Sequence, residues 1–298
     1  MTSASHAKVV LVTGSSAGGI GYALCEEFAA RGCIVYASAR RLASLETLSL
    51  GINRLELDVG SLESCTAAVQ RIIKEQGRID VLVNNAGAGG AGALLDADVE
   101  TEEGGKATFE INFWAPLRMS KLVARHMIER RSGLIVNIGS IVGNIATPWS
   151  GIYSASKAAL HSATETLRME VAGFGLDVML VAPGAITSQF GKKQSASIKL
   201  PADSFYRDVA ERIAERSNMS QRADDRPLIG LLTDHTMPAS KLAHGIVARA
   251  LRSRPARYYS AGGKALLFWI LERIPRPIVW FLLSRSLGAD RVGKVKRA

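Results

Sequence analysis

Short hydrophobic runs alternate with helix-length segments along the first 180 residues of the chain. Several runs are apolar at every position, which is typical of strands covered on both faces. The runs predict strands at 8–13, 34–38, 54–57, 81–84, 134–139 and 178–181, and the intervening segments predict helices at 22–31, 65–76, 108–130 and 155–172. This alternation implies right-handed βαβ crossovers, and therefore an α/β fold with a doubly wound parallel sheet.

The pattern changes after residue 188. Residues 189–240 are polar and charged without clear periodicity, so we interpret them as a substrate-loop insertion over one end of the sheet. Residues 257–260 predict a last strand, and two short apolar runs follow. We therefore expect a single domain over residues 1–264 and an apolar, basic C-terminal helical extension over residues 265–298.

The composition is that of a globular protein, because 47% of the 298 residues are hydrophobic and 21% are charged. Lys and Arg outnumber Asp and Glu by 37 to 27, which gives a net charge of +10. This charge favours an anionic small molecule or an anionic membrane surface. We expect no nucleic-acid partner, since no zinc-finger, helix-turn-helix or RNA-binding motif accompanies the charge.

The three cysteines lie outside any CxxC motif or Cys/His cluster. We therefore expect neither a disulfide framework nor a metal site, and we expect a reducing, intracellular location. The polar N-terminal residues predict no signal peptide. No apolar run approaches the ~18 residues of a transmembrane helix.

A glycine-rich turn, TGSSAGGIG, occupies residues 13–21 between the first predicted strand and the first predicted helix. Glycine lets the backbone turn tightly and approach a pyrophosphate, and the N–H groups at a helix start attract an anion. Such a turn can also be purely structural, but its place between strand and helix favours dinucleotide binding. The residues expected to contact the dinucleotide are Gly14, Ser16, Gly19, Ile20 and Gly21.

The end of the second predicted strand bears on which dinucleotide binds. An acidic residue at this position would hold the ribose hydroxyl of NAD, but the chain has Ser38 followed by Arg40 and Arg41. Two guanidinium groups can hold a 2′-phosphate, with the Ser38 hydroxyl as a helper, so we expect NADPH/NADP+. The alternative is that both arginines are solvated at a helix start. Asp58 and Val59, after the third strand, are expected beside the adenine.

Three residues carry the predicted chemistry. Ser140 follows the fifth predicted strand, and Tyr153 and Lys157 lie four residues apart on one helical face. Reduction of a ketone requires a proton donor, and a neighbouring ammonium group lowers the pKa of a tyrosine hydroxyl. A serine hydroxyl can hold the carbonyl oxygen. Alone, the Tyr and Lys pair could be a surface pair, but Ser140 and the glycine-rich turn argue for a site.

With these motifs, residues 8–187 resemble the short-chain dehydrogenase/reductase family. The resemblance implies a Rossmann-like sheet of about seven parallel strands with helices on both faces. It implies that Ser140 orients the substrate, Tyr153 is the general acid/base, and Lys157 holds the nicotinamide ribose. Asn112 matches the residue that anchors a proton-relay water. The turn departs from the family pattern by one extra residue, so either Gly18 or Gly19 fills the second glycine position.

The same resemblance implies further cofactor contacts. One segment supports the sheet beside the adenosine half of the cofactor, and another lies over the nicotinamide carboxamide. These residues are Asn85, Ala86 and Gly87 in the first segment, and Pro183, Gly184, Ile186, Thr187 and Ser188 in the second.

Within the family, residues 36–41, residues 152–159 and the apolar tail resemble fungal NADPH-dependent 1-acyldihydroxyacetone-phosphate reductases. A hydrophobic or lipid ketone is therefore the expected substrate. A polyketide, terpenoid or steroid-like ketone or alcohol of fungal secondary metabolism is the alternative, and a non-catalytic NADPH-sensing module is a more remote one. Lys192, Lys193 and Lys199 either meet an anionic substrate group or belong to a solvated loop.

The tail predicts membrane association. Trp269 and Trp280 lie beside arginines in apolar runs too short to span a bilayer, which suggests an anchor in the membrane interface. The basic residues that follow could meet anionic headgroups; they are Arg285, Arg291, Lys294, Lys296 and Arg297. The location would then be cytoplasmic or peripheral on endoplasmic reticulum or lipid-droplet membranes. Alternatively, the tail packs on its own fold, covers the pocket, or joins subunits of a homodimer or tetramer.

Overall fold

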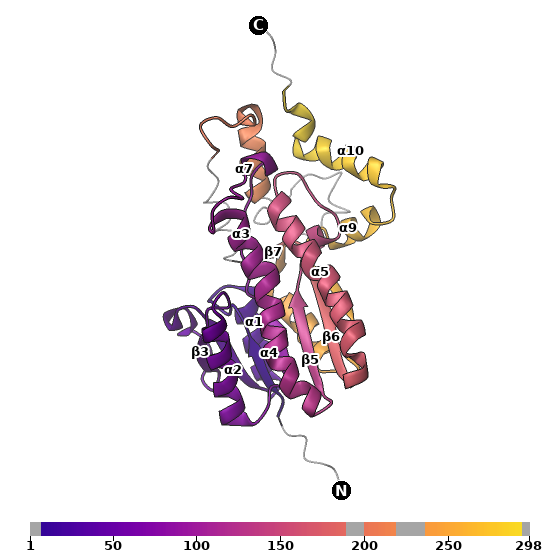
Figure 1. The fold of residues 1–298 in the computed structure, drawn as a ribbon. Helices are drawn as coiled ribbons and strands as arrows, with labels where there is room; N and C mark the ends of the chain where they lie inside the picture. Colours follow the sequence, from indigo (N-terminus) through magenta and orange to yellow (C-terminus); the bar gives the residue numbers. More distant parts are fainter. Residues whose placement is uncertain (1–6, 189–199, 219–235, 294–298) are drawn as a thin grey trace.

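The computed structural model describes residues 7–188, 200–218 and 236–293. At its centre lies a sheet of seven strands in the order β3-β2-β1-β4-β5-β6-β9, and every neighbouring pair is parallel (Figure 1). The strands are β1 (Val9–Val12), β2 (Ile34–Ala39), β3 (Asn53–Glu56), β4 (Val81–Asn84), β5 (Gly133–Ile138), β6 (Leu176–Pro183) and β9 (Tyr258–Ala261). The α/β fold class and the seven strand positions predicted from the apolar runs are confirmed.

Helices cover both faces of the sheet. Along β1, Val10 and Val12 join the hydrophobic cluster beneath α1 (Ile20–Ala30) and α8 (Ala239–Ala250). Val9 and Leu11 point the other way, into the cluster formed with α2, α4 and α5. These helices are α2 (Leu62–Gln76), α4 (Ala115–Glu129) and α5 (Gly151–Val171). Successive strand residues face opposite sides, so an uninterrupted apolar run contributes to both clusters.

The order of the strands creates the place for a ligand. From β1 the chain runs outward through β2 to β3, and then returns to pair β4 with the other side of β1. The loops after β1 and β4 therefore leave the sheet in opposite directions. In open α/β sheets, a crevice at the carboxyl ends of such strands is the usual ligand site.

Further helices lie at the end of the molecule opposite the N-terminus (Figure 1). They are α7 (Ala210–Asn218), α9 (Ala265–Leu271) and α10 (Arg276–Leu287). A small parallel pair, β7 (Ile186–Thr187) with β8 (Met237–Pro238), follows β6. The helix α8 begins at Ala239, within the segment interpreted as an insertion. Its buried residues, from Leu242 to Ala250, belong to the main core.

The predicted helix at 108–130 is interrupted. The structure has α3 (Gly104–Phe109), a π-helical turn (Glu110–Trp114) and then α4. The π-helix is rare and occurs mostly as a single turn inside an α-helix, and the hydrophobic pattern of this segment indicated only one continuous helix. Such turns are frequent at functional sites, and this one contains Asn112.

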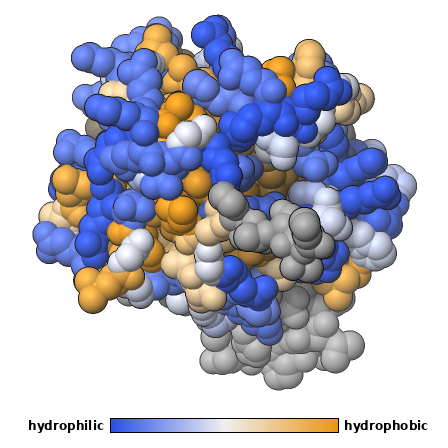
Figure 2. Space-filling model, turned by 90° about the horizontal axis from the view of Figure 1, so that it is seen from below, coloured by the Kyte–Doolittle hydropathy of each residue, from blue (hydrophilic) through white to orange (hydrophobic). Residues whose placement is uncertain are grey.

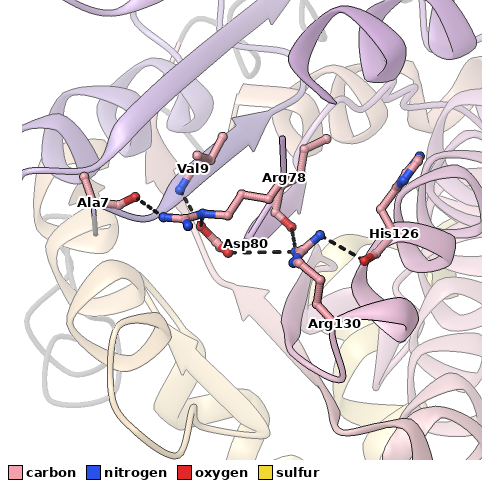
Figure 3. Close-up of polar contacts among 7 residues, drawn as sticks. Ala7, Val9, Arg78, Asp80, His126 and Arg130 are labelled. Atoms are coloured by element: carbon pink, nitrogen blue, oxygen red, sulfur yellow. Dashed lines mark hydrogen bonds and ion pairs between the residues drawn. The ribbon is translucent and has the colours of Figure 1, made fainter. Parts of the chain in front are cut away.

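The amino end of the sheet is held by an ionic network around Asp80 (Figure 3). Its carboxylate accepts a hydrogen bond from the Val9 backbone N–H at 2.8 Å and pairs with Arg78 at 3.0 Å and Arg130 at 3.8 Å. Arg78 also donates to the Ala7 carbonyl at 3.0 Å. This end of the molecule is mostly hydrophilic, with smaller hydrophobic patches (Figure 2). The network therefore joins β1, β4 and α4 far from the carboxyl ends of the strands.

Candidate active site

Ser140 lies directly after β5, at the carboxyl edge of the sheet. It caps a short 3-10 turn, Ile141–Gly143, because its Oγ accepts a hydrogen bond from the Val142 N–H at 3.4 Å. The Ser140 side chain is also hydrogen bonded to the hydroxyl of Tyr153. Tyr153 lies in the first turn of α5, which runs back beside β5 and β6. The structure thus brings together the serine and tyrosine predicted from the sequence.

Lys157 follows one turn later on α5. Its side chain is buried, and Nζ donates to the Ile138 carbonyl at 2.8 Å. Burial disfavours the charged form and lowers the pKa of Lys157 to about 8. Nζ lies 5.8 Å from the centre of the Tyr153 ring. The ammonium group is therefore held beside the tyrosine by the last carbonyl of β5.

Opposing effects act on the pKa of Tyr153. Burial raises this pKa, whereas the hydrogen bond with Ser140 and the positive charge of Arg216 lower it. Burial is the largest effect, so the net direction is upward from the usual value. In this structure the phenol therefore remains protonated at neutral pH, which is the state required of a proton donor.

Asn112 occupies the π-helical turn and is fully buried. Its Oδ1 accepts from the Ala88 N–H at 2.8 Å, and its Nδ2 donates to the Ala88 carbonyl at 2.7 Å and to Ser156 Oγ at 3.0 Å. The side chain therefore ties the loop after β4 to α5. Because both amide protons are used in these contacts, the role of anchoring a relay water stays a prediction.

The glycine-rich turn is packed tightly against the loop after β4. A Cβ at Gly14 would lie 2.7 Å from the Ala86 Cα, and one at Gly21 would lie 2.6 Å from the Gly14 carbonyl oxygen. Asn85 Nδ2 donates to the Thr13 and Gly14 carbonyls at 2.8 and 2.9 Å. Larger residues would force these backbones apart, so the close approach explains the glycines.

The start of α1 can hold an anion. Gly18 has a positive φ of 72°, and Gly19 follows in an extended conformation as the N-cap residue. Gly19 has no side chain, so the N-cap residue itself offers no side-chain acceptor to the first N–H groups of α1. The extra residue of the turn is thus absorbed by Gly18 in a conformation that favours glycine. The uncapped N–H groups and the helix dipole fit the pyrophosphate of a dinucleotide.

The residues after β2 form a second polar region. Arg40 and Arg41 are exposed at the carboxyl end of the strand. The Ser44 hydroxyl donates to the Arg41 carbonyl at 2.7 Å and accepts from Ser16 at 3.2 Å, which joins this segment to the glycine-rich turn. The segment that carries the two arginines is therefore joined to the glycine-rich turn.

The prediction that Ser38 assists the arginines needs correction. Its side chain is fully buried, and its hydroxyl donates to the Val12 carbonyl at 3.0 Å. Ala37 and Ala39 belong to the cluster beneath α1, so alternation along β2 places Ser38 on the opposite face of the strand, and its burial separates it from the exposed arginines. The side chain of Ser38 therefore braces β1 against β2.

The remaining predicted cofactor residues border the same edge. Asp58 is exposed and accepts from the Gly60 N–H at 3.0 Å, while Val59 is buried. A Cβ at Gly87 would lie 3.4 Å from Asn112 Oδ1 and 3.9 Å from Lys157 Nζ. The segment after β6 is fixed where the Gly184 N–H donates to the Ala261 carbonyl at 2.9 Å. Pro183 ends β6, Ile186 and Thr187 form β7, and Ser188 is the last described residue before the gap.

Sequence reasoning missed two residues at the site. One is His161, whose Nε2 accepts from the Ser140 N–H at 3.2 Å and whose Nδ1 lies 2.8 Å from Asn144 Oδ1. Its spacing of four from Lys157 was the available signal. Arg216, on α7, acts on Tyr153 from a segment without hydrophobic periodicity, so no pattern indicated it. Lys192, Lys193 and Lys199 lie outside the described residues.

The C-terminal extension packs on the loop that follows Ser140. Phe268, Leu271 and Val279 are buried against Ile141 and Ile145. Asn144 Nδ2 donates to Glu272 Oε1 at 2.6 Å. Part of the tail therefore packs on its own fold, which was one of the alternatives. In the described part of the chain, no group of three or more His, Cys, Asp or Glu is arranged to hold a metal ion.

Comparison with known proteins agrees with this geometry. A family model described as short chain dehydrogenase matches residues 8–199. The short-chain dehydrogenase ptmH of Penicillium ochrochloron is 36% identical over 276 residues, covering 90% of this chain and 94% of that protein. The NADPH-dependent 1-acyldihydroxyacetone phosphate reductase of Schizosaccharomyces pombe is 34% identical over 216 residues, covering 71% of this chain and 72% of that protein.

A solved structure supports the same assignment. The crystal structure of a short-chain dehydrogenase from Streptomyces avermitilis is 31% identical, with a TM-score of 0.75, and the match covers 94% of this chain and 98% of that one. The resemblance deduced from the motifs is thus confirmed over most of the chain. The chain belongs to the short-chain dehydrogenase/reductase family and is an oxidoreductase of that family.

Proposed function

We propose that this oxidoreductase uses NADPH to reduce a hydrophobic ketone. The observation that carries the proposal is the convergence of Ser140, Tyr153 and Lys157 at the carboxyl edge of the sheet, beside the glycine-rich turn. Exposed Arg40 and Arg41 after β2, with no carboxylate between them and the strand, support NADPH over NADH. The S. pombe relative is itself named as NADPH-dependent.

The proposed mechanism assigns one task to each side chain. NADPH, when bound, supplies the hydride for the carbonyl carbon. The Ser140 hydroxyl donates a hydrogen bond to the carbonyl oxygen, and the Tyr153 hydroxyl transfers its proton to that oxygen as negative charge develops. The Lys157 ammonium stabilises the tyrosinate left behind and holds the ribose hydroxyls. Asn112 keeps the loop at Ala88 in place and anchors the relay water that returns a proton.

The proposed cofactor contacts follow the geometry of the edge. The start of α1 takes the pyrophosphate through Gly14, Ser16, Gly19, Ile20 and Gly21. Arg40 and Arg41 take the 2′-phosphate, and Asp58, Val59 and Asn85 to Gly87 border the adenosine half. Pro183, Gly184, Ile186, Thr187 and Ser188 cover the nicotinamide.

Tyr153→Phe tests the mechanism. This variant keeps the ring but removes the proton donor, so ketone turnover should be abolished while the dissociation constant for NADPH, measured by fluorescence titration, stays within threefold of wild type. Turnover preserved at half of wild type or more would contradict the assignment. A non-catalytic NADPH-sensing module would bind the cofactor but show no turnover in the wild-type protein.

For the substrate, we propose 1-acyldihydroxyacetone phosphate. The S. pombe relative carries that activity in its name, and the apolar helices α9 and α10 lie beside the site, where an acyl chain needs apolar contacts. NADPH oxidation with this substrate should exceed that with a panel of neutral bulky ketones. Turnover of neutral ring ketones alone would instead favour the secondary-metabolism alternative.

We also propose that the outer face of α9 and α10 binds an anionic membrane surface. Large apolar side chains are exposed there, with Trp269 at 51%, Trp280 at 62% and Phe281 at 58%. Arginines accompany them, since the Arg273 guanidinium lies 3.6 Å from the Trp269 ring centre and that of Arg285 lies 5.5 Å from the Phe281 ring centre. Aromatic rings beside cations suit the boundary between acyl chains and anionic headgroups. No helix among the described residues is long and apolar enough to cross a bilayer.

Point variants test this surface better than deletion of residues 265–298, because Phe268, Leu271 and Val279 are buried and deletion would expose the catalytic loop. Wild type should float with vesicles of phosphatidylcholine and phosphatidylserine, and Trp269→Ser with Trp280→Ser should remove most of that binding. Leu50→Ser is the matched control, because Leu50 is an exposed apolar residue far in the sequence from α9 and α10. Equal flotation of all proteins would contradict the proposal. A wild-type dimer that the double variant converts to monomers would show that this face joins subunits.

A further inference from the structure

Arg216 lies at the site without having a place in the proposed mechanism. It is on α7, which packs through the fully buried Ile213 onto Trp149. The Trp149 Nε1–H donates to the Leu287 carbonyl at 2.8 Å, so the end of α10 holds the same cluster. This packing fixes α7 over the segment that leads into α5. Arg216 is therefore positioned by a packed cluster, with its side chain directed toward the residues before Tyr153.

Among the described residues, the Arg216 guanidinium has few contacts. Its Nη2 donates to the buried Thr147 Oγ1 at 3.1 Å. Within residues 7–188, 200–218 and 236–293, no carboxylate forms an ion pair with it. Its other donors can therefore serve an anion, since a guanidinium carries five N–H groups arranged to hold a carboxylate or phosphate.

Arg216 and Tyr153 influence each other directly. The guanidinium charge lowers the pKa of Tyr153, and the tyrosine favours the charged form of the arginine, although burial lowers the arginine pKa overall. The contact with Thr147, six residues before Tyr153, places the guanidinium beside the segment that leads into the first turn of α5. The positive charge therefore lies close to the hydroxyl that, in the proposed function, meets the carbonyl oxygen of the ketone.

We propose that Arg216 binds an anionic group of the substrate, a phosphate or carboxylate carried within a few bonds of the reacting carbonyl. The inference rests on the proposed role of Tyr153. The tyrosine hydroxyl would bind the carbonyl oxygen of the substrate and the guanidinium would bind its anionic group, so these two side chains set how far apart the two substrate groups lie. In 1-acyldihydroxyacetone phosphate, the phosphate is on the carbon next to the carbonyl, so this compound fits. A neutral ketone would leave the guanidinium facing uncharged groups, at a cost in binding.

The test compares two ketones that differ only in the anion, 1-acyldihydroxyacetone phosphate and dephosphorylated 1-acyldihydroxyacetone. Arg216→Gln should raise KM for the phosphorylated ketone about 10- to 100-fold, because a charge-assisted contact is lost. KM for the neutral ketone should change less than threefold, and Arg216→Lys should restore part of the affinity. Arg212→Gln is the matched control, since Arg212 pairs with Glu215 at the surface of the same helix.

Two kinetic results would overturn the inference. Equal losses for both ketones, with a shift in the pH profile, would mean that Arg216 acts only on Tyr153. No loss for either ketone would mean that Arg216 has no role in binding.

A separate measurement distinguishes failure of this inference from failure of the proposed function. It is calorimetric binding of 1-acylglycerol 3-phosphate to the NADP+-loaded protein. If Arg216→Gln weakens this binding in a protein that reduces no ketone, the anion site stands and the reductase assignment fails. Equal binding by wild type and variant would refute the site.

Discussion

The backbone N–H of Ser140 donates a hydrogen bond to Nε2 of His161 at 3.2 Å. The other ring nitrogen, Nδ1, lies 2.8 Å from Asn144 Oδ1, so the neutral tautomer with its proton on Nδ1 satisfies both contacts. A Cβ at Gly143 would lie 2.7 Å from the imidazole ring, so this glycine leaves room for the ring. His161 is thus a positioning residue, clamped between both ends of the loop that carries Ser140.

Replacing His161 with Ala should lower kcat about 10- to 100-fold, because Ser140 would lose the contact that fixes its backbone. KM should change little, since the ring is not expected to touch substrate. Steady-state kinetics with saturating NADPH measure both constants. His161→Gln, which can offer an acceptor to the Ser140 N–H, should recover part of the activity. An equal loss in both variants, accompanied by a lower melting temperature, would indicate a general packing defect instead.

The same ring predicts a loss of stability in acid. Burial, followed by the charge of Lys157, lowers the pKa of His161 to about 4. An unfolded histidine titrates near pH ~6.5, so between these values the unfolded chain binds more protons and stability falls as the pH falls. This group should remove about 3 kcal/mol of unfolding free energy between pH 7 and pH 4. Urea unfolding of wild type and His161→Asn measures the difference.

The control for this pH series is His126→Asn, at a partly exposed position on α4. Its curve of unfolding free energy against pH should follow that of the wild type. A wild-type curve that coincides with that of His161→Asn over the whole range would contradict the assigned pKa.

The sheet and the principal site residues could be predicted from the sequence because each has a local signal. Apolar runs marked the strands, and the spacing of four placed Tyr153 and Lys157 on one face of α5. The burial of Ser38 was missed because the residues around it are all apolar or small. Such a sequence does not show whether the end of the strand is buried or exposed. The relation of Arg216 to Tyr153 depends on how α7 packs on Trp149, which no local pattern encodes.

The C-terminal boundary of the predicted insertion was also not marked by a local sequence signal. Leu242, Ala243, Ile246, Val247 and Ala250 follow a helical period and are buried in the main core. The preceding polar residues hid the start of α8 at Ala239, because its N-cap residue, Pro238, makes no side-chain capping bond. Helix starts without Ser, Thr, Asp or Asn at the cap carry little sequence signal.

Asp80→Asn should reduce stability without affecting catalysis. The change preserves the shape of the side chain but removes the charge that pairs with Arg78 and Arg130. These groups are partly buried, so we expect a loss of about 1–2 kcal/mol in unfolding free energy. Kinetic constants should stay within twofold of wild type, because the network lies at the amino end of the sheet. Asp177→Asn, at an exposed position on β6, is the control and should leave both quantities unchanged.

Removal of the charges after β2 should change cofactor choice. Arg40→Ala combined with Arg41→Ala should raise KM for NADPH about 10- to 100-fold, because a charge-assisted phosphate contact is lost. KM for NADH, which lacks the 2′-phosphate, should change less than threefold. Lys74→Ala, an exposed cation on α2, controls for the loss of net charge. Equal changes for both cofactors would place the arginines outside the phosphate site.

Reduction should slow as the pH rises above the pKa of Lys157. Burial lowers this pKa to about 8, whereas the pKa of Tyr153 is raised from its usual value of 10.0, so the lysine loses its proton first. If the ammonium stabilises the tyrosinate, kcat/KM for the ketone should be level from pH 6 to 7 and fall about tenfold per unit above about 8. Lys157→Arg stays charged throughout this range. Its residual activity should therefore show no such fall, whereas a fall at the same pH in the variant would assign the titration to another group.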